Sequence, residues 1–174
     1  MRRSLFLVLF AFWAFIPSTA FAASGKADLR GTAKDSPITG QVLFEETKGG
    51  LKVTADLQGV PPGKHGFHIH ENGSCSDEGN AAGGHYNPHG TEHGFMPKDG
   101  LNKAHAGDMG NFEAGADGSG HLEVTLKGVT MGEPPDGVRG RAVILHEKED
   151  DFGQPTGNAG KRIGCGVIDI DLTY

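Results

Sequence analysis

Apolar and polar residues alternate strictly along several short stretches of this chain. The clearest case is residues 51–58, where Leu51, Val53, Ala55 and Leu57 are apolar and every residue between them is polar. Successive side chains point to opposite faces of a strand, so a period of two residues predicts a strand with one buried face. The same alternation recurs in two later stretches, residues 122–127 and 168–173.

Turn-forming residues separate these strand-like stretches, as at Lys48-Gly49-Gly50 and Asp117-Gly118-Ser119-Gly120. The pattern predicts eight strands, at residues 24–33, 37–46, 50–58, 63–71, 107–115, 120–127, 140–147 and 164–172. No segment has the period of a convincing amphipathic helix. We therefore expect an all-β fold in which an antiparallel sheet closes, or nearly closes, on itself.

Two stretches without predicted strands, residues 72–106 and 148–163, are far longer than ordinary loops. They are rich in Gly, Asn, Asp and His. Long loops in a compact domain are usually disordered or functional, and this composition favours function.

The first 22 residues have the pattern of a secretory signal peptide. Arg2 and Arg3 precede an apolar run from Leu5 to Ile16, and small residues follow at Ala20-Phe21-Ala22. The run has 12 residues, whereas a membrane helix needs about 20. We expect cleavage near residue 23, leaving one domain, residues 23–174, with no membrane anchor, exported across the inner membrane to the periplasm or the cell exterior.

Charge excludes one class of partner. The chain has 16 basic and 22 acidic residues, a net charge of −6. Proteins that bind nucleic acid neutralise phosphates with Lys and Arg. We therefore expect no nucleic-acid partner.

The chain has two cysteines, Cys75 and Cys165. An oxidising compartment allows them to pair, and only one pairing is available. We predict a disulfide that closes a loop of 90 residues; the alternative is two buried free thiols.

Seven of the nine histidines lie between residues 65 and 105. His68 and His70 are two residues apart on a predicted strand, so both imidazoles project from one face and can bind one ion. His65 faces the other way, and we interpret it as a structural hydrogen-bonding residue.

A second set of candidate ligands comes from the long loop and its end: His85, His93, His105 and Asp108. Three nitrogens and one carboxylate oxygen suit a closed tetrahedral zinc site. His146 ends an apolar strand and could bring another imidazole to the first pair. Imidazoles without a thiolate favour copper or zinc, and copper binds such sites most tightly. His89 and His121 lie outside both sets, and we interpret them as ordinary surface residues.

The histidine-bearing segments resemble the copper,zinc superoxide dismutases. The matching segments follow the family order through nearly the whole mature chain: His65-Gly66-Phe67-His68-Ile69-His70-Glu71, Gly83-Gly84-His85-Tyr86-Asn87-Pro88, His93-Gly94, His105-Ala106-Gly107-Asp108-Met109-Gly110-Asn111, His146-Glu147-Lys148 and residues 157–167. The resemblance implies a Greek-key β-barrel or sandwich.

The resemblance also implies a role for each residue of the two sets. The copper ligands would be His68, His70, His85 and His146. The zinc ligands would be His85, His93, His105 and Asp108, so that His85 bridges the two ions. Asp150 would hydrogen-bond one ligand of each metal, Arg162 would line the copper channel, and Cys75 and Cys165 would form the disulfide within the subunit.

The implied function is that of an oxidoreductase with one copper and one zinc ion per subunit. Copper would cycle between its +2 and +1 states and so dismutate superoxide to O₂ and H₂O₂, while zinc, which has no redox chemistry, would be structural. Arg162 would offer a permanent positive charge to the small anion, and His85 would accept and return a proton. The alternatives are an exported copper- and zinc-binding or metal-delivery protein without turnover, and a zinc-only structural module.

Two features depart from the eukaryotic cytosolic members of this family. The loop between His146 and Arg162 is shorter, with four acids in its first five residues. Attraction of an anion would then depend on local cations, for which the candidates are Lys98, Lys103 and Lys161. The cysteine loop is rearranged and Asp169 lies in the last strand, so a homodimer is one possible assembly rather than a firm expectation.

Overall fold

The structure, a computed structural model, describes residues 24–132 and 134–170. The predicted signal peptide lies outside the described residues. Within them there are nine strands, a single turn of 3₁₀-helix and one short α-helix. They are β1 (Ser24–Gly31), β2 (Thr39–Thr47), β3 (Gly50–Gln58), β4 (Gly63–His70), η1 (Asn80–Ala82), α1 (Met96–Asp99), β5 (Asp108–Ala114), β6 (Gly120–Leu126), β7 (Ala142–His146), β8 (Arg162–Val167) and β9 (Asp169–Ile170).

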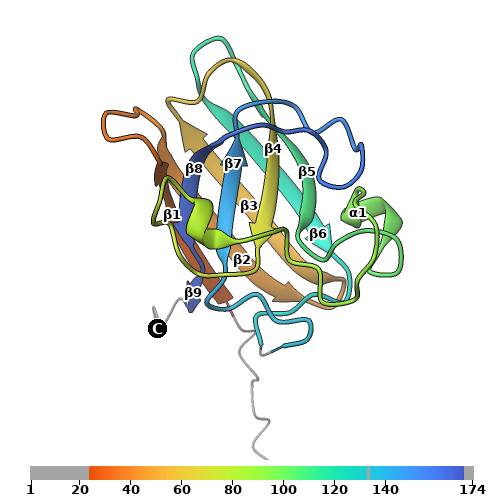
Figure 1. Cartoon of the computed structure of the whole chain (residues 1–174). Coiled ribbons are helices and arrows are strands. Elements are labelled where there is room, and N and C mark those ends of the chain that lie inside the picture. The colour runs from red at the N-terminus through yellow and green to blue at the C-terminus, as the bar shows by residue number, and fades with distance from the viewer. Residues whose placement is uncertain (1–23, 133, 171–174) are drawn as a thin grey trace, which may run out of the picture.

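The strands form one antiparallel sheet that curls into a nearly closed barrel (Figure 1). The order of hydrogen-bonded neighbours is β5-β4-β7-β8-β1-β2-β3-β6, and β9 pairs separately with β1. The two ends of this order, β5 and β6, lie against each other and are joined by a tight turn at residues 115–119. Because β3 pairs with β6 and β4 pairs with β7, the order is that of a Greek key. The predicted all-β fold class is confirmed.

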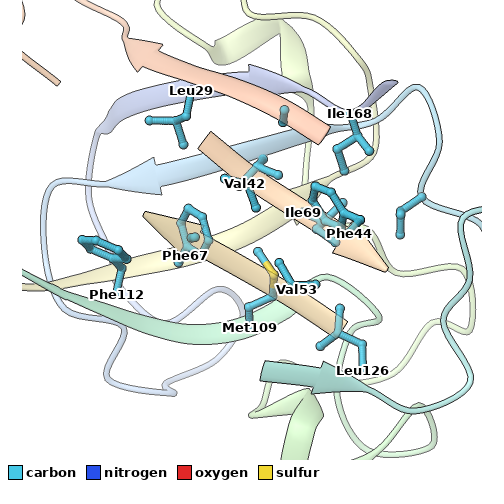
Figure 2. Close-up of a cluster of buried hydrophobic side chains, with 14 of the residues drawn as sticks. Leu29, Val42, Phe44, Val53, Phe67, Ile69, Met109, Phe112, Leu126 and Ile168 are labelled. Carbon is cyan, nitrogen blue, oxygen red and sulfur yellow. The ribbon is translucent and has the colours of Figure 1, made fainter. Parts of the chain in front are cut away.

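The alternating residues of the sequence form the barrel core. Leu51, Val53, Ala55 and Leu57 of β3 are all buried, as their period predicts. Figure 2 shows side chains from strands all around the barrel meeting inside it, among them Leu29, Val42, Phe44, Val53, Phe67, Ile69, Met109, Phe112 and Leu126. This apolar filling stabilises the fold and gives the strands that carry the site a rigid support.

On β4 and β7, and on parts of β5 and β8, the outward-facing residues are buried too. Phe67 and Ile69 of β4 point into the core, and His68 and His70 lie on the opposite face with almost no exposure. The two long loops cover that outer face, and the first of them carries His85, His89, His93 and His105. α1, on the first of these loops, packs against β5 and β6 (Figure 1).

The last predicted strand is not one strand but two, and this prediction was wrong in detail. β8 ends at Val167, and at Ile168 the backbone leaves the sheet: its N–H donates to Arg141 and its carbonyl accepts from Gly140. Ile168 itself is fully buried in the core. The chain then returns to the sheet as β9, whose Ile170 pairs with Gly25. In the described part of the chain, no helix is long and apolar enough to cross a membrane.

Candidate metal centre

The predicted ligands meet in two adjoining groups. The first group is His68, His70, His85 and His146, and the second is His85, His93, His105 and Asp108. Within each group the candidate ligand atoms all lie within 4.8 Å of one another, and every one of the seven residues is buried. His85 belongs to both groups, so one imidazole joins them.

The barrel strands place the first group. His68 and His70 are on β4, and β4 pairs with β7, which ends at His146. His85 comes from the long loop and forms an isolated backbone bridge with His70. Asp108, the first residue of β5, pairs with His68 on β4, so the second group begins directly beside the first.

Backbone carbonyls orient two imidazoles of the first group, and a carboxylate orients a third. The Nδ1 of His70 lies 2.9 Å from the carbonyl oxygen of Gly83, and the Nδ1 of His146 lies 3.3 Å from that of Gly160. These contacts leave the Nε2 atoms of His70 and His146 facing each other at 3.4 Å. His85 is turned the other way: its Nδ1 lies 2.9 Å from Asp108 Oδ1, which leaves its Nε2 for the first group.

Asp150 connects the two groups through hydrogen bonds to a histidine of each. Its carboxylate lies 2.8 Å from His68 Nε2 and 2.9 Å from His93 Nε2, so it accepts a hydrogen bond from one ligand of each group. Asn111 holds the backbone of Asp150, accepting from its N–H at 2.7 Å and donating to its carbonyl at 2.9 Å. Partners of this kind fix the ring orientation of metal-bound histidines.

Three buried nitrogens have no hydrogen-bond partner among the described residues, and this shows that the residues fit metal ions. They are the Nδ1 atoms of His68, His93 and His105. Those of His93 and His105 lie 2.8 Å and 3.2 Å from Asp108 oxygens but are not aligned for hydrogen bonds. Ligand atoms of a tetrahedral zinc ion lie about 3.3 Å apart, so this spacing is close to that of a common metal.

Burial favours the neutral form of three imidazoles in the first group, and this is the form that metal binding requires. Burial lowers the pKa of His70 to about 2, with the nearby His85 adding to the effect. Burial likewise lowers the pKa of His146 to about 3. It lowers the pKa of His85 to about 4, although the hydrogen bond with Asp108 partly opposes this.

The second group is organised around negative charge. Burial would lower the pKa of His93, but the adjacent carboxylates of Asp108 and Asp150 outweigh it and raise that pKa to about 9. Burial alone would raise the pKa of both aspartates. The imidazoles of His105, His85 and His93 hold the pKa of Asp108 well below its usual range, and those of His68 and His93 do the same for Asp150.

A cavity of about 500 Å³ opens from the first group to solvent. His70, His85 and His146 lie in its wall, together with residues of the second long loop and two cationic residues, Lys148 and Arg162. The three lysines expected from the sequence to attract an anion, Lys98, Lys103 and Lys161, do not line it. Lys148 was not predicted from the sequence. Its position two residues after His146 could have suggested that the two side chains lie on the same side of the backbone.

Arg162 is held in place by the disulfide loop. Its guanidinium donates to the carbonyl oxygens of Gly79 at 2.6 Å and Gly83 at 2.5 Å. Gly83 also accepts from His70, so one carbonyl orients both the arginine and a candidate ligand. The predicted disulfide between Cys75 and Cys165 is present, and it anchors this loop to β8.

The remaining histidines are structural or superficial. The ring nitrogens of His65 lie 2.9 Å and 2.8 Å from the carbonyl oxygens of His146 and Pro61, which confirms the structural role predicted for it. His89 pairs with Asp136 and His121 pairs with Asp56, both away from the two ligand groups.

Fold and site together define a β-barrel metalloprotein with two adjoining metal sites, one of which opens to solvent at a cationic cavity. The sequence model of the copper/zinc superoxide dismutases matches residues 38–168. The extracellular Cu-Zn superoxide dismutase of Brugia pahangi is 36% identical over 143 residues, which cover 76% of this chain and 70% of the relative. The Cu-Zn superoxide dismutase of Onchocerca volvulus is 36% identical over 145 residues, covering 76% and 89% of the two chains.

Among solved structures, the clock protein EA4 superposes with a TM-score of 0.76 at 34% identity, covering 90% of this chain and all of that one. The chain belongs to the copper/zinc superoxide dismutase family. It is an oxidoreductase that dismutates superoxide to O₂ and H₂O₂, with one copper and one zinc ion as its cofactors.

Proposed function

We propose that the first ligand group binds copper and the second binds zinc, with the imidazole of His85 shared between them. The membership of His85 in both groups is the observation that carries this assignment. Four imidazoles without a hard oxygen favour copper, and the set that includes Asp108 favours zinc. The opening of the cavity onto the first group puts the redox ion where superoxide can reach it.

Each role in the reaction then falls to a residue with suitable chemistry. When bound, copper supplies one-electron exchange between its +2 and +1 states, and zinc supplies a fixed charge without redox chemistry. Arg162 binds and orients the anion at the cavity wall through its planar, permanently charged guanidinium. His85 Nε2 holds a proton when it is free and returns it to the reduced product; the second proton comes from water in the cavity. Two superoxide ions and two protons thus give O₂ and H₂O₂.

Single substitutions in each group test the assignment. We expect His70→Ala to lose copper and keep zinc, since His70 belongs only to the first group, and His105→Ala to do the reverse. His121→Ala, a change at an exposed histidine outside both groups, is the matched control and should keep both metals. Elemental analysis and superoxide consumption are measured on each protein. Loss of both metals from His70→Ala and His105→Ala alike, or of neither, would refute the separate assignment.

We also propose that the protein is exported from the cytoplasm. Cleavage near residue 23 would leave residues 23–174 as a single domain in the periplasm or outside the cell, and the disulfide supports an oxidising compartment. The extracellular relative supports secretion. Homodimerisation stays a prediction, and native mass spectrometry of the mature protein tests both the cleavage point and the number of chains.

A further inference from the structure

Three alternate residues of the loop between β7 and β8 converge on His93. Asp150 accepts from the Nε2 of its ring, the ring of Phe152 lies nearly parallel to its ring, and Gln154 contacts its backbone. Neither Phe152 nor Gln154 was singled out by the sequence, because a single glutamine or phenylalanine in a polar loop has no recognisable pattern. Together these residues wrap the second ligand group from its outer side.

Gln154 pairs with the backbone of His93 through both ends of its amide. Its Oε1 accepts from the His93 N–H at 3.0 Å, and its Nε2 donates to the His93 carbonyl at 2.8 Å. His93 lies in an irregular loop and has no neighbouring strand to satisfy these groups. The glutamine side chain therefore does what a partner strand would do, and it fixes the backbone from which the imidazole projects.

Phe152 closes the same side of the site. Its ring stacks on that of His93 at 6.4 Å between centroids and 19° between planes, and it contacts Phe95 from the other side. Its N–H donates to Asp150 Oδ1 at 2.8 Å, with the backbone in the left-handed region at φ 59°. Phe152 is 44% exposed, so part of its ring lies on the surface.

The backbone of the loop between β7 and β8 also packs closely against Asp150 and His93. A Cβ on Gly157 would lie 1.8 Å from Asp150 Oδ1 and 2.8 Å from His93 Nε2, so no side chain fits there. The residues that follow, including Asn158 and Gly160, line the cavity over the first ligand group. The same short loop therefore contacts the second ligand group and forms part of the wall of the cavity at the first group.

We propose that Gln154 is a positioning residue for His93, which it fixes through the backbone. This inference rests on the proposed role of His93 as a zinc ligand. By holding His93 in place before and after metal binding, Gln154 slows the loss of zinc. It also couples zinc binding to the position of the cavity wall, because the residues that contact His93 and the residues that line the cavity belong to the same loop.

Zinc release from protein carrying both metals tests this role. The variants are Gln154→Ala and Gln154→Met; methionine keeps the length of the side chain but has no amide. Gln58→Ala, at an exposed glutamine at the end of β3, is the control. Zinc transfer to an excess of a coloured chelator is followed over time, and residual copper is measured in the same samples.

We expect both Gln154 variants to lose zinc about tenfold faster than wild type, the lower end of the effect seen when partners of metal ligands are removed. Gln58→Ala should match wild type, and copper should be retained. The visible spectrum of Co²⁺ bound in place of zinc should shift in the Gln154 variants, because the ring of His93 is less firmly held. The stability of the metal-free proteins should fall less than that of the zinc-loaded proteins, because the Gln154 contacts act chiefly on the zinc ligand.

Three results would overturn the inference. The first is zinc release at the wild-type rate in Gln154→Ala, and the second is release at the wild-type rate in Gln154→Met alone. The third is a loss of stability in the metal-free variants that is as large as the loss in the zinc-loaded variants. The second would show that bulk matters and the amide does not, and the third that the role is merely structural. All three leave the metal assignment intact. Failure of wild-type protein to bind zinc, or zinc binding that is unaffected by His93→Ala, would instead refute the proposed function.

Discussion

At the scale of single residues, the two nitrogens of His85 explain why the two ligand groups adjoin. Nδ1 faces Asp108 in one group, and Nε2 faces the other three imidazoles. Burial lowers the pKa of this ring to about 4, so at physiological pH the ring is neutral and one of its nitrogens is free. Binding of a second ion displaces the remaining N–H proton from the other nitrogen.

Arg162 should affect the rate without affecting the metals. It belongs to neither ligand group, and its guanidinium lines the cavity. We expect Arg162→Ala to keep its copper but to consume superoxide at least about tenfold more slowly, because local positive charge speeds anion capture by 10–10³. Arg162→Lys should recover part of the loss, since it restores the charge but not the fork held by two carbonyls. Superoxide decay after a radiolysis pulse measures this; equal rates at equal copper content would contradict the role of Arg162.

Lys148 is the lysine that the structure favours for attracting the anion, because it lines the cavity. We expect Lys148→Ala to slow superoxide consumption severalfold at low ionic strength and much less at high ionic strength, where screening removes the attraction. Lys127→Ala, at an exposed lysine just after β6, serves as the control. If instead Lys98, Lys103 and Lys161 together account for the salt dependence, the cavity wall is not what guides the substrate.

His93 should release a proton when zinc binds. Its pKa is raised to about 9, so at pH 7 the metal-free protein carries an imidazolium there, and zinc must displace that proton. We expect about one proton to be released per zinc at pH 7 and none from this group well above pH 9. Calorimetry of zinc binding in buffers with different ionisation enthalpies counts the protons, and release that does not change with pH would contradict the assignment.

The stability of the metal-free protein should depend on pH in the opposite direction to zinc binding. A raised pKa means that the charged form of His93 stabilises the fold. That contribution is complete below the unfolded pKa of about 6.5 and is lost as the pH rises through about 9. Binding of zinc and stability of the metal-free chain should therefore change in opposite directions with pH.

At the scale of secondary-structure elements, the disulfide connects the loop after β4 to β8. It closes a loop across 90 residues, which the chain-entropy account values at about 4–5 kcal/mol. We expect the double substitution Cys75→Ser and Cys165→Ser to lower the free energy of unfolding by about that amount. Activity should fall more than the metal content, since the same loop holds Arg162 through Gly79. Denaturant unfolding and metal analysis of the double variant check both points, and an unchanged midpoint would contradict the first.

The strands were largely predictable and their interruptions were not. Alternation gave β3 with its correct buried face, because each strand carries that pattern in its own residues. The break at Ile168 depends on hydrogen bonds to Arg141 and Gly140, which approach from elsewhere in the chain. The same reason explains why Gln154 and Lys148 escaped notice: their importance comes from what lies beside them in space.

At the scale of the whole molecule, a net charge of −6 would repel an anionic substrate. Two cationic residues, Lys148 and Arg162, line the cavity at the first ligand group, so attraction of the anion is local rather than general. The ligand groups could be predicted from histidine spacing and family resemblance because chelation needs particular residue types. The depth of the cavity and its walls could not, since they depend on how two long loops fold over β4 and β7.

Anomalous diffraction from crystals of the protein loaded with copper and zinc tests the shared imidazole most directly. Data collected at the two absorption edges should give one copper peak beside His85 Nε2 and one zinc peak beside His85 Nδ1, each about 2.0–2.1 Å from its nitrogen. A single peak, or two peaks that are not joined by the ring of His85, would contradict the account.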